Sequence, residues 1–451
     1  MLGIVVSRAD SASVHIGEHL RAVADWERET DESRPDGEGG GTVYRLDGVE
    51  LREFDPFHLE LDRVAEAFGD IDLLVFASRH SGETGQLLTA HHTGNFGPAE
   101  YGGEAGAFAA ACPNAHSRVV EALSHHAPEG YEVGMECTHH GPTEVGVPSM
   151  FVEVGSDEPQ WDDPDAARAV AKAILDLRGV GPLAPREDGI RRHVVGFGGG
   201  HYVPRFERIV RETDWAVGHI GADWGIDAMG DPEEHRDVLE AAFEASAADH
   251  AVLADDCPDL EATVESLGYR VVGETFVRET TGVPLALVER IEDALGPIGE
   301  GTRLGTRADE FDGELVVSDL PVELRDEVQG IDPDAAREAV ESIAVAFETV
   351  EGGTRLGDRV ALVGESDRTA IVEEFAEILE SKYESVKLTA EAVIAHKREF
   401  DPEKARTLGI SEGPAFGKLS AGQPVEVDGR TIPPETVHED RVRQFHLQKD
   451  H

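Results

Sequence analysis

The residues of this chain best suited to chemistry are histidines that follow short apolar runs and lie beside glycines. They occur in four segments: His91-His92-Thr93-Gly94-Asn95, residues 136–143 (ECTHHGPT), residues 198–202 (GGGHY) and residues 218–221 (GHIG). Imidazole ligates metals and transfers protons near neutral pH. In an α/β protein, such side chains meet at the carboxyl ends of the strands. Four clusters in one region therefore predict an enzyme site.

The run that begins at Glu136 offers the densest set of reactive groups. Glu136 and His139 or His140 could ligate a metal together, or one could orient another as a general base. Local hydrogen bonding at a strand end is the alternative for an isolated pair, but a second pair at His91 and His92 favours a site. We expect Cys137 to be a packing residue, because most buried cysteines are.

The glycine run before His201 predicts an anion or oxyanion site. It leads from an apolar strand into a helix that starts at Pro204, and main-chain amides at such a junction bind negative charge. The Gly-Lys-Ser/Thr end of a phosphate-binding loop is missing, and the glycine spacing is not that of a dinucleotide fold.

Zinc chemistry suits this inventory. Zinc takes histidine and carboxylate ligands and lowers the pKa of a bound water to about 7. The chain has no HExxH motif, so the spacing leaves open which histidines converge. For His219, a hydrogen-bonded core position is the alternative to a ligand.

The candidate residues fall into three groups. The candidate catalytic residues are Thr93, Glu136, His139, His140 and His201. The candidate substrate-binding residues are Asn95, Gly198, Gly199 and Gly200. The candidate metal ligands are His91, His92, His139 and His219.

The composition limits the class of protein. The chain has 451 residues and a net charge of −51, with 91 Asp and Glu against 40 Lys and Arg. Such a surface is typical of a protein that works in molar salt, where screening removes self-repulsion. Acidic proteins are unusual nucleic-acid binders, but in high salt that rule weakens, so the charge does not exclude RNA.

Cysteine use and hydropathy point to a cytosolic protein. The three cysteines lack CxxC spacing, which favours free thiols. The N-terminal apolar run is too short for a signal peptide, and no stretch approaches the ~20 apolar residues of a membrane span. We expect neither a membrane nor DNA as a partner.

Strands alternate with helices over residues 1–295, which predicts a mostly parallel sheet with helices on both faces. We expect a polar loop at Glu29–Gly41, a helix at Leu59–Phe68 and a long functional loop at Gly82–Ala110. The catalytic domain is expected to end near Leu295.

Residues 296–451 read as a smaller α/β unit followed by a Gly/Pro-rich tail. A helix is expected from Asp334 to Phe347, and Asp428-Gly429 suits a tight hairpin turn. The segment Gly413–Leu419 resembles the tail of tRNA 3′-processing endonucleases.

Several motifs in order resemble one family, the archaeal-type D-aminoacyl-tRNA deacylases that also occur in plants. The resemblance rests on residues 3–8 and 10–13, on Ser78-Arg79-His80, and on residues 91–95, 134–142, 196–202 and 218–219. It covers most of residues 1–295, and the acidic, longer form is similar to the haloarchaeal members.

The resemblance implies the substrate and the cofactor. It implies hydrolysis of the ester between a D-amino acid, such as D-tyrosine, and the 3′ end of its tRNA, with two zinc ions per subunit. It also implies a phosphorylase/peptidyl-tRNA-hydrolase-like α/β fold.

Our hypothesis for the reaction is attack on the ester carbonyl by a metal hydroxide, or by a water that Glu136 or a histidine activates. The alternatives are a zinc-dependent aminoacylase or peptidase on the same fold, and a non-catalytic tRNA-binding protein. The oligomeric state stays open.

Overall fold

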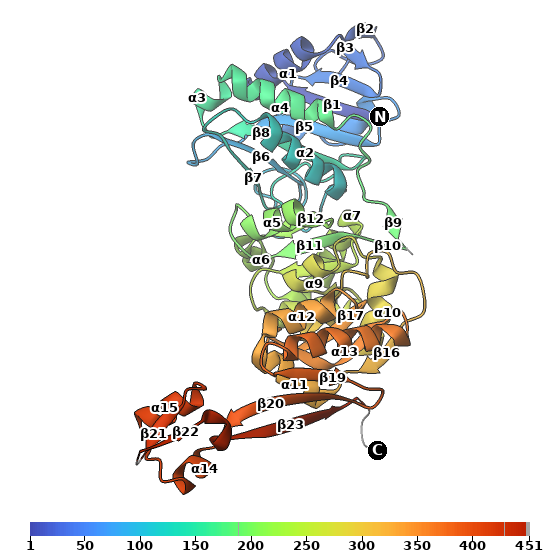
Figure 1. The fold of residues 1–451 in the computed structure, drawn as a ribbon. Helices are drawn as coiled ribbons and strands as arrows, with labels where there is room; N and C mark the ends of the chain where they lie inside the picture. The colour runs from blue at the N-terminus through green and yellow to red at the C-terminus, as the bar shows by residue number, and fades with distance from the viewer. Residues whose placement is uncertain (188, 428, 448–451) are drawn as a thin grey trace. The chain divides into compact units, whose positions relative to one another are not determined.

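In the computed structural model, which describes residues 1–187, 189–427 and 429–447, the chain forms two compact units, Met1–Thr281 and Gly282–His451 (Figure 1). The division precedes helix α10 (Leu285–Leu295), whereas we expected the catalytic domain to end near Leu295. The last carbonyls of α10, at Ala294 and Leu295, accept hydrogen bonds from Arg359 of the second unit. These bonds explain why the helix belongs to that unit.

The first unit contains an eight-stranded, mostly parallel sheet. In spatial order its strands are β2 (Glu27–Asp31), β3 (Gly41–Leu46), β4 (Val49–Phe54), β1 (Leu2–Ser7), β5 (Leu73–Arg79), β8 (Ser149–Gly155), β6 (Leu87–His91) and β7 (Glu132–Met135). Strands β4, β1, β5 and β8 run parallel, whereas β6 is antiparallel to β8 and parallel to β7. Every residue of β1, β6 and β8 is buried, as expected for strands covered on both faces.

Helices cover one face of this sheet. They are α1 (Ser11–Val23), α2 (Pro113–His126), α4 (Pro164–Asp176) and the short α3 (Glu158–Trp161) (Figure 1). The side chains of Asp10 and Asp163 cap the first amides of α1 and α4, a common role of aspartate at helix starts.

Within the described chain, the other face of the eight-stranded sheet lacks the α-helices that we expected on both faces. The 3₁₀ turns η1 (His58–Glu60) and η2 (Val64–Ala67) and loop residues such as Ala109 and Val145 pack there, where we expected α-helices. The predicted helix at Leu59–Phe68 is therefore wrong: Arg63, with φ of +51°, separates the two turns. The thin covering of this face leaves space for the site described below.

Two predicted loops contain strands. The polar segment from Glu29 includes most of β2, an exposed edge strand that the ion pair of Arg45 with Glu29 joins to β3. Its alternating charges read as a loop, but charged side chains are common on edge strands. The long loop predicted from Gly82 contains the buried strand β6.

Residues 193–271 form a separate parallel sheet, which the sequence analysis did not distinguish from the first. Its order is β12 (Ala216–Gly221), β11 (His193–Phe197), β13 (His250–Leu253) and β14 (Arg270–Val271). The helices of this region are α5 (Pro204–Glu212), α6 (Asp223–Met229), α7 (Arg236–Ser246), α8 (Pro258–Ser266) and α9 (Glu274–Glu279). A two-stranded hairpin, β9 (Arg186–Glu187) with β10 (Ile190–Arg191), precedes this sheet.

The second unit is built on an antiparallel sheet in the order β15 (Thr302–Leu304), β17 (Ala346–Val350), β18 (Arg355–Leu362) and β16 (Val316–Asp319). Its helices, besides α10, are α11 (Val322–Ile331), α12 (Pro333–Glu341) and α13 (Glu365–Leu379). The helix predicted to reach Phe347 ends at Glu341, because the apolar run after it forms β17.

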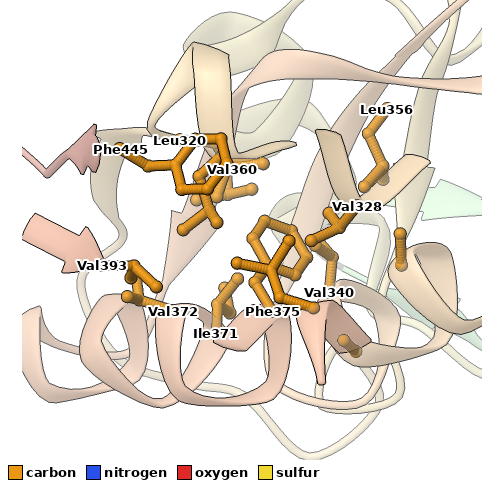
Figure 2. Close-up of a cluster of buried hydrophobic side chains, with 14 of the residues drawn as sticks. Leu320, Val328, Val340, Leu356, Val360, Ile371, Val372, Phe375, Val393 and Phe445 are labelled. Atoms are coloured by element: carbon orange, nitrogen blue, oxygen red, sulfur yellow. The ribbon is translucent and has the colours of Figure 1, made fainter. Parts of the chain in front are cut away.

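The core of the second unit extends into a long hairpin. Strands β19 (Ser385–Leu388), β20 (Ala392–Phe400) and β23 (His438–His446) form a three-stranded sheet. Val393 of β20 and Phe445 of β23 pack with Phe375 and Val360 in one apolar cluster (Figure 2). The base of the hairpin is thereby fixed in the core.

A small module follows at the other end of this hairpin (Figure 1). It contains α14 (Pro402–Thr407), α15 (Pro414–Ser420), β21 (Val425–Val427) and β22 (Arg430–Ile432). Strands β21 and β22 pair as an antiparallel hairpin, although Asp428 of the predicted turn lies outside the described residues. The module has its own apolar cluster: Ala405, Ile410, Leu419, Val425 and Val437.

No helix in the described part of the chain is both long enough and apolar enough to cross a bilayer.

Candidate active site and metal centre

The site is centred on Glu136, which follows the last residue of β7 and is fully buried. Three imidazoles lie around its carboxylate. Oε2 accepts a hydrogen bond from His201 Nε2 at 2.8 Å, Oε1 lies 3.0 Å from His80 Nδ1, and His139 Nε2 is 3.7 Å from Oε2. The end of β7 thus holds a carboxylate against histidines from three different segments.

A second buried carboxylate, Glu153, comes from the middle of β8. Its oxygens lie 3.7 Å from His80 Nδ1 and 3.7 Å from His91 Nε2. One ligand atom each of His91, Glu136 and Glu153 can be chosen so that all lie within 4.8 Å of one another. Two buried carboxylates so close repel strongly, so the arrangement requires positive charge between or beside them.

Three histidines present the same ring nitrogen to this region. The Nδ1 of His91 bonds the carbonyl of His92 at 3.1 Å, that of His139 the carbonyl of Cys137 at 2.8 Å, and that of His140 the carbonyl of Gly141 at 2.7 Å. A ring that donates its Nδ1 hydrogen to a carbonyl keeps a lone pair on Nε2, the form in which histidine binds a metal.

Burial sets the charge state of two of these rings. It lowers the pKa of His140 to about 4 and that of His139 well below its usual value. Both are therefore neutral at pH 7, as a ligand must be.

The carboxylates raise the pKa of two other histidines, His80 and His91. Burial lowers the pKa of His80, but Glu136 and Glu153 outweigh it and raise the pKa to about 11. Burial also lowers the pKa of His91, and the charge of Glu153 reverses that effect. Burial raises the pKa of Glu136, but the proximity of His201 and His80 holds it well below its usual range. Without a metal, protonated histidines therefore supply the positive charge.

Four groups of three donors could hold a metal ion within the described residues. They are His91 with His139 and His140; Cys137 with His139 and His201; His80 with Glu136 and His201; and His91 with Glu136 and Glu153. The first and third groups share no residue, so they could be filled independently.

Local backbone contacts fix the two histidine segments against each other. The amide of Gly94 donates to the carbonyl of His140 at 2.9 Å, and Thr93 Oγ1 donates to the carbonyl of Pro142 at 2.8 Å. His140 has a φ of +46°, which is strained for a residue other than glycine. Thr93, a candidate catalytic residue, is buried and takes this connecting position.

A cavity of about 700 Å³ opens onto the site. Polar groups at its wall include His80, His139, His140, Glu153 and His201. Asn95 also lines it, while its amide donates to the carbonyls of Gly102 and Glu104 and so shapes the neighbouring loop. The rest of the wall includes four aromatic side chains: Phe57, Tyr101, Phe151 and Trp224.

His92 and His219, two of the candidate ligands, lie outside all four donor groups of the described chain. Both nitrogens of each ring already have partners. His92 bonds the carbonyl of Gly218 and the amide of Cys112, and His219 bonds Thr138 Oγ1 and the carbonyl of Ala109. They connect the two parallel sheets instead of facing the cavity.

The glycine run is also used structurally. The amide of Gly198 donates to the carbonyl of Gly221 at 2.8 Å, and that of Gly199 to Asp223 Oδ1 at 3.1 Å. Gly198, Gly199 and Gly200 are absent from the cavity wall. The run turns the chain so that His201 reaches Glu136, and Cys137 donates its amide to the carbonyl of His201 at 2.9 Å.

Two residues of the site were missing from the candidate set, His80 and Glu153. His80 follows β5 directly, and that position at a strand end could have identified it. Glu153 lies within the apolar run SMFVEVG, where a charged residue in a fully buried strand signals a paired or ligating carboxylate.

An α/β fold that gathers buried imidazoles and carboxylates beneath an open cavity defines the chain as an enzyme with a candidate metal centre. Its sequence relatives specify the family. The model of the D-aminoacyl-tRNA deacylase family matches residues 67–272. The D-aminoacyl-tRNA deacylase of Haloarcula marismortui is 58% identical over 451 residues, which cover 99% of this chain and 100% of the relative. The D-aminoacyl-tRNA deacylase of Natronomonas pharaonis is 55% identical over 445 residues, which cover 99% of this chain and 100% of the relative.

A solved structure has a similar fold. The crystal structure of AF0625, described as a conserved protein of unknown function, matches with a TM-score of 0.53 and 30% identity, over 62% of this chain and 98% of that one. The chain belongs to the D-aminoacyl-tRNA deacylase family and is a hydrolase. The family and the enzyme class expected from the sequence are thereby confirmed.

Proposed function

We propose that the chain hydrolyses the ester between a D-amino acid and the 3′ end of tRNA with the help of zinc at the buried His/Glu cluster. The observation that carries the zinc assignment is the pair of buried carboxylates, Glu136 and Glu153, which approach within 4.8 Å among imidazoles. The names of the relatives supply the substrate. We also propose that the fold is phosphorylase/peptidyl-tRNA-hydrolase-like, as the resemblance implies.

The donors fit zinc in type and state. His91 Nε2 is buried without a hydrogen-bond partner, and Glu136 Oε1 has the contact with His80 Nδ1 at 3.0 Å, so a cation would satisfy His91 Nε2. His91, His139 and His140 would hold one ion through Nε2. A second ion, which the resemblance implies, would take His80, Glu136 and His201. Bound zinc would polarise the ester carbonyl and lower the pKa of a water molecule.

With one ion bound, Glu136 and His201 are free to move protons. The His201 ring lines the cavity and is 36% exposed, and its Nε2 hydrogen is held by Glu136. His201 Nδ1 contacts Cys137 Sγ at 3.8 Å, so a water that displaces this contact could give its proton to Nδ1 while Glu136 stabilises the imidazolium. The same proton can then pass to the ribose oxygen that leaves.

Aromatic side chains at the cavity would hold the end of the substrate. The exposed large aromatic residues of the described chain are Tyr101, Trp224 and Tyr202, at 68%, 50% and 36% exposure. Tyr101 and Trp224 line the cavity, and Tyr202 bonds His80 Nε2 at 2.9 Å. We assign Trp224 to stacking on the terminal base, an interaction that salt screens less than a phosphate contact.

The test is release of tyrosine from D-tyrosyl-tRNA and L-tyrosyl-tRNA in molar KCl, with and without a chelator. We expect release of D-tyrosine alone, its loss after chelation and its recovery with zinc. Release that chelation leaves unchanged would remove zinc from the proposal. Metal analysis of the active protein would show whether one or two ions are bound.

A further inference from the structure

Almost all of the net negative charge of the chain lies in residues 1–381. Residues 1–381 hold 79 of the 91 acidic residues and 29 of the 40 Lys and Arg, whereas residues 382–451 hold 12 and 11. Six of the seven lysines lie in this last part: Lys382, Lys387, Lys397, Lys404, Lys418 and Lys449. The C-terminal segment is therefore close to neutral, unlike the rest of the protein.

This difference matters for a protein whose substrate is a polyanion. At 1 M salt the Debye length is about 3 Å, so a phosphate interacts mainly with the charges that it touches. Distant acidic residues then repel RNA little, but an acidic surface still offers no partners to phosphates. Contact with RNA requires a local surface that carries Lys or Arg.

Within the segment, the long hairpin has its charges paired. Glu399 of β20 forms ion pairs with Lys397 and Arg441, and Glu327 of α11 pairs with Lys382 and Arg443. The nine residue pairs of β20 and β23 give the hairpin a length of roughly 30 Å. It is a neutral arm fixed in the core of the second unit.

The module at the end of this arm carries unpaired cations. Lys418 of α15 and Arg430 of β22 are exposed, and neither forms an ion pair within the described residues. Arg430 lines a shallow cavity of about 520 Å³ together with the hydroxyl-bearing Thr431 and Thr436. A guanidinium beside hydroxyl groups suits a phosphate or a ribose.

We propose that the terminal module, residues 401–427 and 429–437, contacts the phosphate backbone of tRNA, with Lys418 and Arg430 as phosphate ligands. The contact lies on nucleotides other than the 3′-terminal ones, which the cavity of the first unit takes up. The inference rests on the action of the family on tRNA and adds a second point of substrate contact.

The test compares two double variants of equal charge change. Lys418→Glu/Arg430→Glu alters the module. Arg178→Glu/Arg186→Glu is the matched control. It lies in residues 178–211, a short segment of the first unit where basic residues outnumber acidic ones, seven to three. Arg178 and Arg186 are exposed and form no ion pair in the described chain. The substrates are full-length D-tyrosyl-tRNA and the D-tyrosyl ester of a short RNA with only the 3′-terminal nucleotides.

We expect the module variant to lose on the order of tenfold in kcat/KM for the full-length substrate, through KM, at 1 M KCl. Its activity on the short ester and the activity of the control variant on both substrates should match wild type. The unchanged short-ester activity also shows that the catalytic unit of the variant is folded.

Three results would overturn the inference: equal activity of all proteins on full-length tRNA, an equal loss on both substrates, or a loss in the control variant alone. If wild type hydrolyses neither ester, the proposed function fails instead. Binding of uncharged tRNA would then test the module independently: weaker binding by the module variant than by wild type would support the contact, and equal binding would overturn it.

Discussion

Glu136 is the residue on which the proposed chemistry depends, because one buried carboxylate orients His201 and also faces His80 and His139. Glutamine keeps the shape but cannot stabilise an imidazolium. We expect Glu136→Gln to lower kcat by about 10²–10⁴, the usual contribution of an acid–base group. Zinc bound by His91, His139 and His140 should remain, as measured by metal analysis. Glu132→Gln, at the exposed start of the same strand, is the control. Loss of a second ion along with the activity would identify Glu136 as a ligand of that ion.

Substitution of Trp224 would show whether this side chain binds the terminal base or the amino acid of the substrate. Its side chain is half exposed at the cavity wall, and stacking on one base contributes about 1–3 kcal/mol. We expect Trp224→Ala to lower kcat/KM for D-tyrosyl-tRNA and D-alanyl-tRNA by similar factors, on the order of tenfold, while Trp224→Phe keeps most of the activity. A loss confined to D-tyrosyl-tRNA would instead assign Trp224 to the amino acid.

The sequence identified many of the site's residues but could not separate ligands from structural histidines. His91 and His92 are neighbours in one motif, yet His91 Nε2 faces Glu153, whereas both nitrogens of His92 bond backbone groups. The difference arises because successive residues at a strand end point in opposite directions. The spacing contains no information about those backbone partners, which come from other strands.

The apolar runs in the sequence predicted the strands, but they did not predict how the strands are grouped into sheets. β5 and β11 read alike as buried parallel strands, and hydropathy does not state which strands pair. In the structure they belong to different sheets. The site lies where the two sheets meet, since Glu136 follows β7 and His201 follows β11. Sequence reasoning placed these residues at strand ends but could not show that they converge.

Thr138 connects the end of β7 to β12 and offers a test of this junction. Its Oγ1 accepts from the amide of Ile220 at 2.9 Å and bonds His219 Nδ1 at 3.1 Å, and its amide donates to the carbonyl of Ile220. Thr138→Val would leave a buried amide and a ring nitrogen unpaired. We expect the free energy of unfolding to fall by about 1–3 kcal/mol in urea denaturation. Thr138→Ser retains the hydroxyl and should lose less; equal losses would show that packing of the methyl group matters more.

The whole molecule combines an acidic catalytic unit with an almost neutral C-terminal segment. In molar salt the acidic surface no longer repels RNA at a distance, so substrate contact can be divided between the cavity with its aromatic side chains and a small module that exposes Lys418 and Arg430. The two contacts should differ in salt dependence, because stacking releases few counterions and phosphate binding releases many.

The stability of the first unit should depend on pH through its buried neutral histidines. Burial lowers the pKa of His58 to about 3, and that of His116, His193 and His219 to about 4. The unfolded chain, with histidine pKa values of ~6.5, binds more protons below that pH, so stability is complete above pH 6.5 and falls towards pH 4. Each such histidine contributes up to about 1.4 kcal/mol per pH unit. Urea unfolding of metal-free protein between pH 7.5 and 5, in 2 M KCl, measures the slope. His193→Gln should reduce it by up to that amount, and an unchanged slope would show that His193 is protonated in the folded state as readily as in the unfolded chain.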